Sequence, residues 1–440
     1  MLEGRAAIAA AVHADLVDRL GRTRVFGGDD AKRLCGIDPA VREGPLALVR
    51  PATTEHVEWI VKVGRQRHAQ LMPRMRLPVS QPDEVRDTLV VDLAGLQRPA
   101  AVDIGRRTVT VGVGVDVVQI DRLARQARLC LRALPAFGDT EKVGWLLARG
   151  DPGELGLGGG SLLDDVVGAE VVTGGGRALH LGAADLLGCA PWLAAGLGQP
   201  LGQLLGSEGR LAILCEVTLR LHPAGEVSWI SSELPADREA LLAAASAARQ
   251  AQSASLCDTA LVVETAGAAS LHLRVQAAGQ EALARHVAAL RTLGQRFGFQ
   301  LGDATAESRR ARLGMEASAW PRPAPVGHAL DWRVPWPDVA SVWDLTAALY
   351  ADAGEAPGRI WAFGADGVRL RCLIATRPDT HPLVVRAGLL MDAGAVPIGV
   401  GSLLRTAARD RLPTSSKVLL AALQRAWDPE SVLAVRTGIG

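Results

Sequence analysis

Apolar residues recur at helical spacing in several separate stretches of the chain. The clearest case follows residue 52, where Thr53 or Thr54 can cap a helix whose apolar positions are Val57, Ile60 and the residues just after them. A later helix ends where Asp428 precedes a proline, since that arrangement disfavours helical backbone. The same spacing predicts further helices over residues 8–20, 117–127, 237–249, 281–297 and 417–427.

Short apolar or alternating runs between these helices predict strands. Three runs lie over residues 70–72, 88–93 and 107–115, and they alternate with helices in a β-α-β manner that favours an α+β or α/β domain. Glycines are dense over residues 142–188. Beyond about residue 225 the helices become rich in alanine, which indicates a second domain. The other predicted strands cover residues 166–172, 178–181, 211–221, 260–264, 271–276, 331–334 and 368–375.

Composition places the chain among ordinary globular proteins. Of its 440 residues, 48% are hydrophobic and 22% charged, and the net charge is +1, so a nucleic-acid partner is not expected. The closest two of the six cysteines, Cys189 and Cys215, are 26 positions apart, which disfavours a zinc site or an iron–sulfur cluster. Reduced thiols in a cytoplasmic protein are expected instead. The longest uncharged stretch, residues 186–207, contains two prolines and five glycines, so no membrane span is expected.

Two glycines bracket a Ser-Glu pair directly before the predicted strand 211–221. Glycine at positions 206 and 209 allows positive φ and close approach of a ligand to the backbone. Successive N–H groups in such a turn can form a nest for an anion. The same residues, Gly206-Ser207-Glu208-Gly209, also fit an ordinary tight turn before a strand.

This turn is one of several motifs that occur in a fixed order, and through them the chain resembles the FAD-linked oxidase family. Members of that family include vanillyl-alcohol oxidase, D-lactate dehydrogenase and the D and E subunits of glycolate oxidase. The resemblance is strong over residues 40–223, and residues 225–400 fit as the family's cap domain. The motifs are Leu48-Val49-Arg50-Pro51 with Val57, Pro73-Arg74, Val90-Val91-Asp92-Leu93, Thr108–Gly114, Val167–Val172, Gly206–Gly209 and Leu423–Leu433.

The resemblance implies an α+β fold and a flavin cofactor. An N-terminal helical segment (residues 1–39) would precede a two-subdomain, PCMH-type FAD-binding domain (residues 40–223). An α+β cap domain (residues 224–400) would follow, and residues 401–440 would return to the FAD domain. Its cofactor-binding residues would be Pro73, Arg74, Arg76, Gly144, Trp145, Gly160, Gly206, Ser207, Glu208, Gly209 and Ile213.

The first phosphate loop departs from the family pattern. There, Pro-Arg is followed by a run of glycines, whereas here Pro73-Arg74 is followed by Met75-Arg76-Leu77-Pro78-Val79. Bulky side chains resist positive φ, and Pro78 has no N–H group. This loop therefore cannot wrap a diphosphate with backbone N–H groups. Arg74 and Arg76 offer a substitute, since guanidinium groups pair directly with phosphate.

The second loop is altered as well. The family's Thr-hydrophobic-Gly-Gly pattern appears here as Glu141-Lys142-Val143-Gly144, followed by Trp145. A carboxylate near a diphosphate is repulsive unless a cation such as Lys142 offsets it. Further along, Gly160 ends a run of three glycines that either offers backbone N–H groups near the flavin or forms plain turns.

The family's active-site histidine is not retained. The segment that corresponds to its His-x-Gly-Asp-Gly-Asn motif begins with Phe363, which can neither bind a metal nor carry a proton. Arg369 or Arg371, close behind, can pair with a substrate carboxylate. No general base and no metal site are identifiable. The first loop has no histidine or cysteine, so any flavin is expected to be non-covalent.

Two functional hypotheses follow. In the first, the chain is an FAD-dependent oxidoreductase that oxidises a small 2-hydroxy acid of the glycolate or D-lactate kind. Its electrons would leave through a flavin or iron–sulfur partner subunit, because the chain has no cluster-binding cysteines of its own. In the second, it is a non-catalytic subunit that keeps the fold and has lost the cofactor. The altered loops and the missing histidine fit the second hypothesis well.

Overall fold

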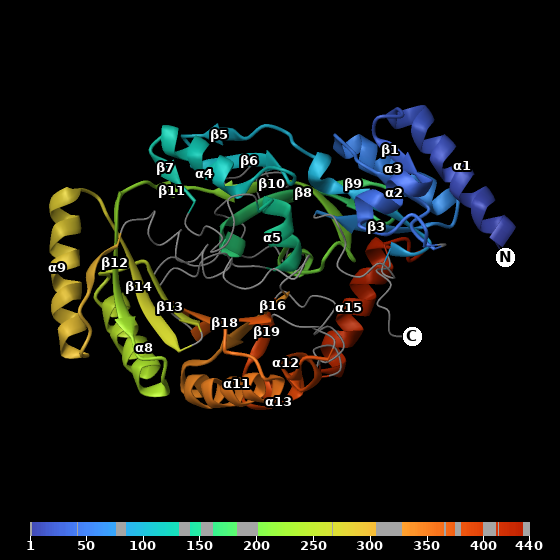
Figure 1. The fold of residues 1–440 in the computed structure, drawn as a ribbon. Helices are drawn as coiled ribbons and strands as arrows, with labels where there is room; N and C mark the ends of the chain where they lie inside the picture. The colour runs from blue at the N-terminus through green and yellow to red at the C-terminus, as the bar shows by residue number, and fades with distance from the viewer. Residues whose placement is uncertain are drawn as a thin grey trace.

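In the computed structural model, two α+β bodies face one another (Figure 1). The N-terminal part is built on sheets of four and five strands with a short two-stranded sheet, and the cap on one sheet of eight. The structure describes residues 2–41, 43–75, 85–131, 141–150, 162–182, 201–265, 267–304, 328–364, 367–374, 380–398, 411 and 413–433.

The first sheet has the strand order β1-β2-β4-β3. Strands β2, β4 and β3 are parallel, so their carboxyl ends lie at one edge, while β1 is antiparallel to β2. The predicted cap is confirmed, since the hydroxyl of Thr53 accepts the N–H of His56 at the start of α3. The elements are α1 (Leu2–Leu20), β1 (Val25–Gly27), α2 (Gly28–Cys35), β2 (Ala47–Val49), α3 (Thr54–Gln66), β3 (Gln70–Arg74), β4 (Thr88–Asp92) and the 3-10 turn η2 (Leu93–Gly95).

The second sheet is antiparallel, in the order β5-β6-β10-β8-β9. One apolar core joins it to the first sheet, because fully buried Val91 of β4 and Val217 of β10 belong to the same cluster. The elements are β5 (Ala101–Asp103), β6 (Thr108–Gly112), α4 (Val117–Gln126), β7 (Leu129–Cys130), α5 (Val143–Arg149), η3 (Leu162–Asp165), β8 (Val166–Thr173), β9 (Ala178–Gly182), α7 (Leu201–Leu204), β10 (Ala212–Arg220) and β11 (His222–Pro223).

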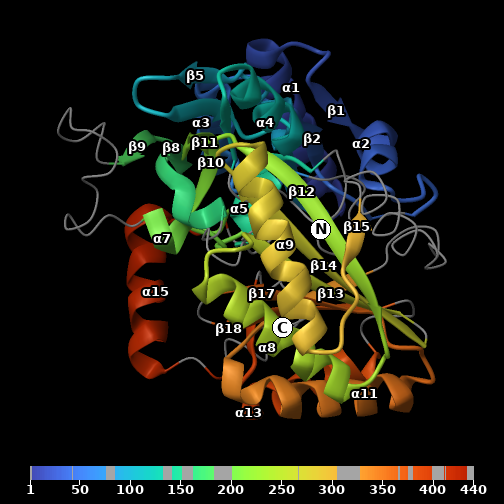
Figure 2. The same cartoon turned by 90° about the vertical axis from the view of Figure 1, so that its left-hand side faces the viewer.

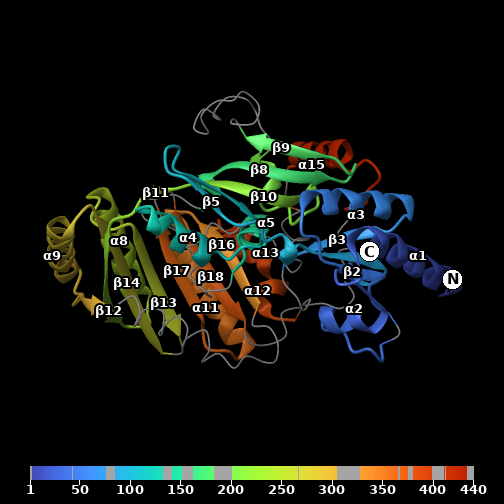
Figure 3. The same ribbon diagram turned by 90° about the horizontal axis from the view of Figure 1, so that it is seen from above.

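The cap sheet has the order β15-β12-β14-β13-β17-β18-β16-β19, and each described pairing in it is antiparallel. Helices α8, α11 and α13 cover the face turned away from the N-terminal part (Figures 1 and 3). The elements are β12 (Glu226–Leu234), α8 (Arg238–Ser253), β13 (Thr259–Thr265), β14 (Ala268–Ala277), α9 (Gln280–Arg296), β15 (Gly302–Ala304), β16 (His328–Val334), η5 (Trp336–Asp338), α11 (Val339–Ala353), β17 (Arg359–Gly364), β18 (Gly367–Ile374), α12 (Pro382–Val385), α13 (Ala387–Asp392) and β19 (Val396–Ile398).

The last described segment leads back from the cap to the first sheet. Helix α15 (Thr414–Trp427) runs between the two bodies in Figure 1, and the segment after it joins β3, where the N–H of Leu71 donates to Val432 O at 2.8 Å. Asp428 accepts the N–H groups of Val432 and Leu433 at 2.8 and 2.7 Å. Burial raises the pKa of this carboxyl, and the two N–H groups oppose part of the rise.

Figure 2 looks at the cap from the side of α9, with the N-terminal part above and α11 and α13 at the opposite end. The face of the cap sheet without these helices is therefore turned toward the N-terminal part. Within the described residues, no helix is both long and apolar enough to cross a membrane. The described His, Cys, Asp and Glu side chains form no group of three that could hold a metal ion.

Candidate functional site

Charged residues stand at the carboxyl ends of the three parallel strands. Arg50 directly follows β2, Arg74 ends β3, and Asp92 ends β4 opposite Arg74 in the strand register. Arg50 Nε lies 2.7 Å from Asp92 Oδ2. Burial raises the pKa of the Cys35 thiol to about 11, and the positive charge of Arg74 opposes part of that rise. Open sheets with parallel strands bind ligands at this edge, so its charges are candidates for phosphate contact.

The Gly206–Gly209 turn lies beside that edge. Gly206, Glu208 and Gly209 all have positive φ, of 80°, 53° and 80°. The N–H groups of Gly206 and Glu208 donate to Leu147 O and Ala148 O of α5, each at 2.9 Å. A Cβ on Gly209 would lie 3.1 Å from the ring of Pro73 in β3. The turn is therefore held between the end of α5 and the end of β3.

The backbone N–H groups in this region are used by the fold. Besides the two that bond to α5, the N–H of Ser207 donates to Leu204 O at 3.1 Å. The N–H of Gly144 donates to Val113 O at 3.0 Å. The anion nest that the glycine pattern suggests is thus not formed by Gly206, Ser207, Glu208 or Gly144.

Met75 occupies the space beside Gly144. The residue is 7% exposed, and a Cβ added to Gly144 would lie 1.9 Å from Met75 Cε. Glycine is required at position 144 because the methionine packs against its backbone. The first residue of the altered loop is therefore part of the core between β3 and α5 rather than of an open crevice.

Two side-chain donors in the turn have no partner within the described residues. Both Ser207 Oγ and Arg210 Nε are buried and lack a hydrogen-bond partner there. Buried donors are nearly always paired in folded proteins. Both can donate to an anion such as the diphosphate of FAD. The first phosphate loop of this chain lacks the glycines whose backbone N–H groups would otherwise bind it. Among the described residues, the fit to the cofactor is thus through these side chains and not through the N–H groups of Gly144 or Gly206.

The other predicted cofactor residues do not gather at one site among the described residues. Trp145 is half-buried in α5, and Pro73 is buried in β3. Ile213 is fully buried in β10 opposite Val172 of β8, which makes it a core residue. Arg76 and Gly160 lie outside the described residues.

A cluster of arginines lies on the cap-sheet face turned toward the N-terminal part. Arg333 of β16 is paired with Arg369 of β18, and Asp331 is paired with Arg371 in the same register. Asp331 Oδ1 lies 3.2 Å from Arg369 Nη2, and its two oxygens accept Arg371 Nε and Nη2 at 2.7 and 2.9 Å. The two predicted arginines are thus brought together, with Asp331 between them. We call these four residues the inner cluster.

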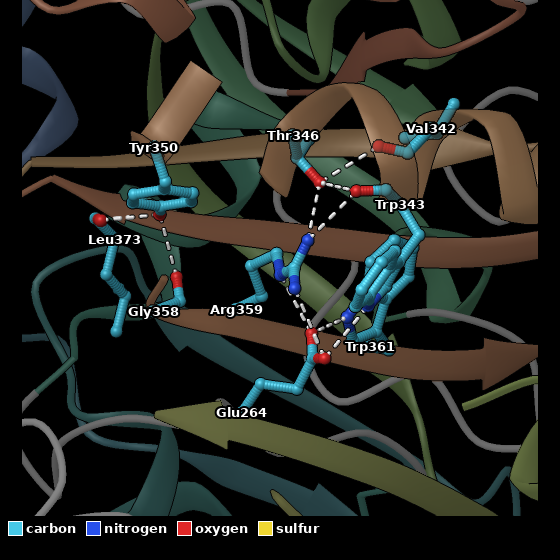
Figure 4. A network of polar contacts seen from close by, with 9 residues as sticks. All are labelled: Glu264, Val342, Trp343, Thr346, Tyr350, Gly358, Arg359, Trp361 and Leu373. Carbon is cyan, nitrogen blue, oxygen red and sulfur yellow. Dashed lines mark hydrogen bonds and ion pairs between the residues drawn. The ribbon is translucent and has the colours of Figure 1, made fainter. Parts of the chain in front are cut away.

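A second charged cluster lies on the opposite face of the same sheet (Figure 4). Glu264 Oε2 of β13 lies 2.8 Å from Arg359 Nε, and Glu264 Oε1 accepts a hydrogen bond from Arg359 Nη2 at 3.3 Å. The indole N–H groups of Trp343 and Trp361 donate to the same carboxylate at 2.9 and 2.6 Å. Arg359 Nη1 also donates to Thr346 Oγ1 of α11 at 2.9 Å. We call these five residues the outer cluster; sequence reasoning did not single them out.

Phe363, at the position of the family's histidine, lies on the outer face. It is fully buried, and its ring stacks on Trp336 with centroids 5.9 Å apart. This residue belongs to the core between the sheet and its helices, and its replacement of histidine leaves no titratable group there.

Comparison with protein families finds the "FAD binding domain" over residues 45–182. D-lactate dehydrogenase of Archaeoglobus fulgidus is 25% identical over 219 residues, which are 47% of this chain and 46% of that protein. D-2-hydroxyglutarate dehydrogenase of Xanthomonas citri pv. viticola is 27% identical over 179 residues, 40% of this chain and 37% of that protein. Each match thus covers less than half the length of the relative.

The solved structures with this fold extend the likeness to nearly the whole chain. p-Cresol methylhydroxylase with substrate bound has a TM-score of 0.79 at 14% identity, covering 98% of this chain and 97% of that one. 4-Ethylphenol oxidase from Gulosibacter chungangensis has a TM-score of 0.77 at 14% identity, covering 98% and 96%. Residues 45–182 are therefore an FAD-binding domain, and the chain has the fold of vanillyl-alcohol oxidase/PCMH-type flavoproteins.

Proposed function

We propose that this chain is an FAD-dependent oxidoreductase that oxidises a small 2-hydroxy acid at the carbon bearing the hydroxyl group. The FAD-binding domain match and the two relatives, a D-lactate and a D-2-hydroxyglutarate dehydrogenase, support this class of reaction. FAD, when bound, supplies the hydride acceptor. The protein binds and orients the acid.

The observation that carries the proposal is the inner cluster. Three arginines and one aspartate gather on the cap face that is turned toward the FAD-binding domain, and Arg369 and Asp331 are buried there. Guanidinium groups match carboxylates in charge and in planar geometry. A substrate carboxylate is the anion that a 2-hydroxy acid would bring to such a surface.

The contacts within the cluster suggest different roles for the two predicted arginines. Arg371 directs both Nε and Nη2 to Asp331, which fixes its side chain. Arg369 meets Asp331 through one nitrogen at 3.2 Å. We assign the substrate carboxylate to Arg369, where it competes with Asp331, and we assign Arg371 as a positioning residue.

Anaerobic titration of the FAD-loaded chain tests this function. D-lactate, glycolate and D-2-hydroxyglutarate are added in turn, and bleaching of the flavin absorbance is followed. We expect at least one acid to reduce the flavin, and Arg369→Leu to raise the acid concentration for half-reduction about tenfold or more. Arg285→Leu, on the exposed side of α9, is the control. Loaded flavin that none of the acids reduces would contradict the proposal.

The contact between Met75 and Gly144 supports a second candidate function, that of a cofactor-free subunit. In that case the fold serves to bind or position an active flavin or iron–sulfur partner subunit. A purified chain that is colourless and takes up no FAD from solution favours this candidate. We propose a cytoplasmic location for either form, because the five cysteines that the structure describes are free and buried.

A further inference from the structure

The Gly206–Arg210 turn contains two buried donors whose partner is not among the described residues. Ser207 offers a hydroxyl and Arg210 a guanidinium Nε. An unpaired buried donor destabilises the fold, and more so where the group is charged. Both groups can donate to an anion, and Arg210 brings a positive charge that favours one.

The backbone of the turn is strained where these donors lie. Glu208 has a φ of 53°, a left-handed conformation that glycine adopts freely and other residues rarely. Two hydrogen bonds to α5 and the contact of Gly209 with Pro73 hold it there. Strain of this kind is retained at ligand sites when the surrounding structure enforces it.

The position of the turn also favours a phosphate ligand. Pro73, which Gly209 touches, is followed by Arg74 at the carboxyl end of β3. Ligands of parallel sheets bind beyond this end. The turn therefore lies beside the strand end that carries Arg74.

We propose that Ser207 and Arg210 form a side-chain site for the diphosphate of the bound dinucleotide, replacing the glycine loop that this chain lacks. This inference rests on the proposed function for the identity of the ligand as FAD. The contact itself requires only a diphosphate ester. Binding by a guanidinium and a hydroxyl group depends on charge, so the affinity for the ligand falls steeply as the salt concentration rises.

Ligand titration of the apo chain tests the site without any measurement of turnover. FAD binding is followed by quenching of flavin fluorescence, and binding of ADP-ribose, riboflavin and inorganic pyrophosphate by calorimetry, each at 50 and 500 mM NaCl. We expect FAD, ADP-ribose and pyrophosphate to bind in a salt-dependent manner. Riboflavin, which has no phosphate, should bind at least tenfold more weakly than FAD.

Variants identify the donors. Arg210→Gln should weaken binding of FAD and ADP-ribose about ten- to a hundredfold and reduce the salt dependence, since a hydrogen bond from a charged group is lost. Ser207→Ala should weaken both about two- to tenfold, and Ser207→Thr should restore part of the affinity because it keeps the hydroxyl. Arg220→Gln, at the far end of β10, is the matched control. Arg210→Lys keeps the charge if the glutamine variant does not fold.

The outcomes separate this site from the oxidoreductase function. If ADP-ribose and pyrophosphate bind through Ser207 and Arg210 while no acid reduces the flavin, the diphosphate site stands and the proposed reaction falls. If wild-type chain binds none of the phosphate ligands, or if both variants bind FAD as tightly as the Arg220→Gln control, the side-chain site is wrong.

Discussion

The two faces of the cap sheet carry clusters of arginine and carboxylate side chains that differ in the ratio of positive to negative groups. In the outer cluster, one glutamate faces one arginine, and two indole N–H groups complete the shell of the carboxylate. In the inner cluster, Asp331 lies among Arg333, Arg369 and Arg371. The first is neutral as a unit, whereas the second has more guanidinium than carboxylate groups among its members.

The difference indicates which cluster supports the fold and which supports function. Glu264, Arg359 and Trp361 come from two strands, and Trp343 and Thr346 from α11, so the outer cluster fixes that helix on the sheet (Figure 4). The ion pairs of the inner cluster join Asp331 to Arg369 and Arg371 within the sheet, on the face turned toward the FAD-binding domain. We infer that the pair enclosed between sheet and helix serves the fold, whereas guanidinium groups on the face toward the FAD-binding domain are placed to bond a substrate carboxylate.

The largest effect is expected from breaking the outer pair. Glu264→Gln leaves the buried guanidinium of Arg359 without a counter-charge, and we expect a loss of about 3–5 kcal/mol in the free energy of unfolding of the cap. Urea unfolding followed by tryptophan fluorescence measures it. The double variant Glu264→Met, Arg359→Met removes both charges and should recover most of the loss. A single variant within 1 kcal/mol of wild type would show that the pair does not hold α11 in place.

Much of this comparison could not have been predicted from the sequence. Patterns of apolar residues predicted β13 and β18 to within a few positions, because each alternates or is continuously buried. They missed β12, β17 and α11. Strand β17 is buried at every position and starts with an arginine, and nothing local indicates that its partner is Glu264, 95 positions away. The pairing depends on tertiary structure.

The candidate site, too, could be predicted from the sequence only in part. The order of motifs identified the FAD-binding domain and pointed to Arg369 and Arg371, which the sheet register then places beside Asp331. The glycine pattern suggested backbone donors at Gly206, and the resemblance to the family placed Gly144 in the second phosphate loop. Some glycines bind phosphate, whereas Gly144 leaves room for Met75 and Gly206 bonds to α5. The sequence does not distinguish these cases, because each position requires a residue without a Cβ.

A second, smaller effect is expected on the inner face. Asp331→Asn keeps the shape of the side chain and removes its charge, so we expect a stability loss of about 2–3 kcal/mol from the weaker contacts to Arg371 and Arg369. Binding of a carboxylate probe such as D-lactate should become tighter, roughly two- to tenfold, because the internal competitor has been neutralised. Calorimetry with D-lactate checks this. Tighter binding by the Glu264→Gln variant as well would remove the distinction between the faces.

A third prediction sharpens the role of the indole donors. Trp343→Phe keeps an aromatic ring beside Arg359, whose Cζ lies 4.7 Å from the indole centroid, and loses only the N–H to Glu264. We expect a loss of about 1–2 kcal/mol, as for one hydrogen bond to a charged group. Thermal unfolding of Trp343→Phe and of the exposed-site control Ser246→Ala provides the measurement. Equal melting temperatures would mean that the ring alone accounts for the contribution of Trp343.

The smallest effect on stability, and the most specific test of function, is expected from Arg369→Lys. The charge remains, so the unfolding free energy should fall by roughly 0.5–1 kcal/mol. An ammonium group cannot reproduce the planar fork of a guanidinium, so the half-reducing concentration of the acid should still rise severalfold. Arg371→Lys should instead cost more stability, because Arg371 gives two nitrogens to Asp331 where Arg369 gives one. If both lysine variants lost stability equally and left flavin reduction unchanged, the inner cluster would be a second structural pair. The excess of guanidinium groups on that face would then have no role in binding substrate.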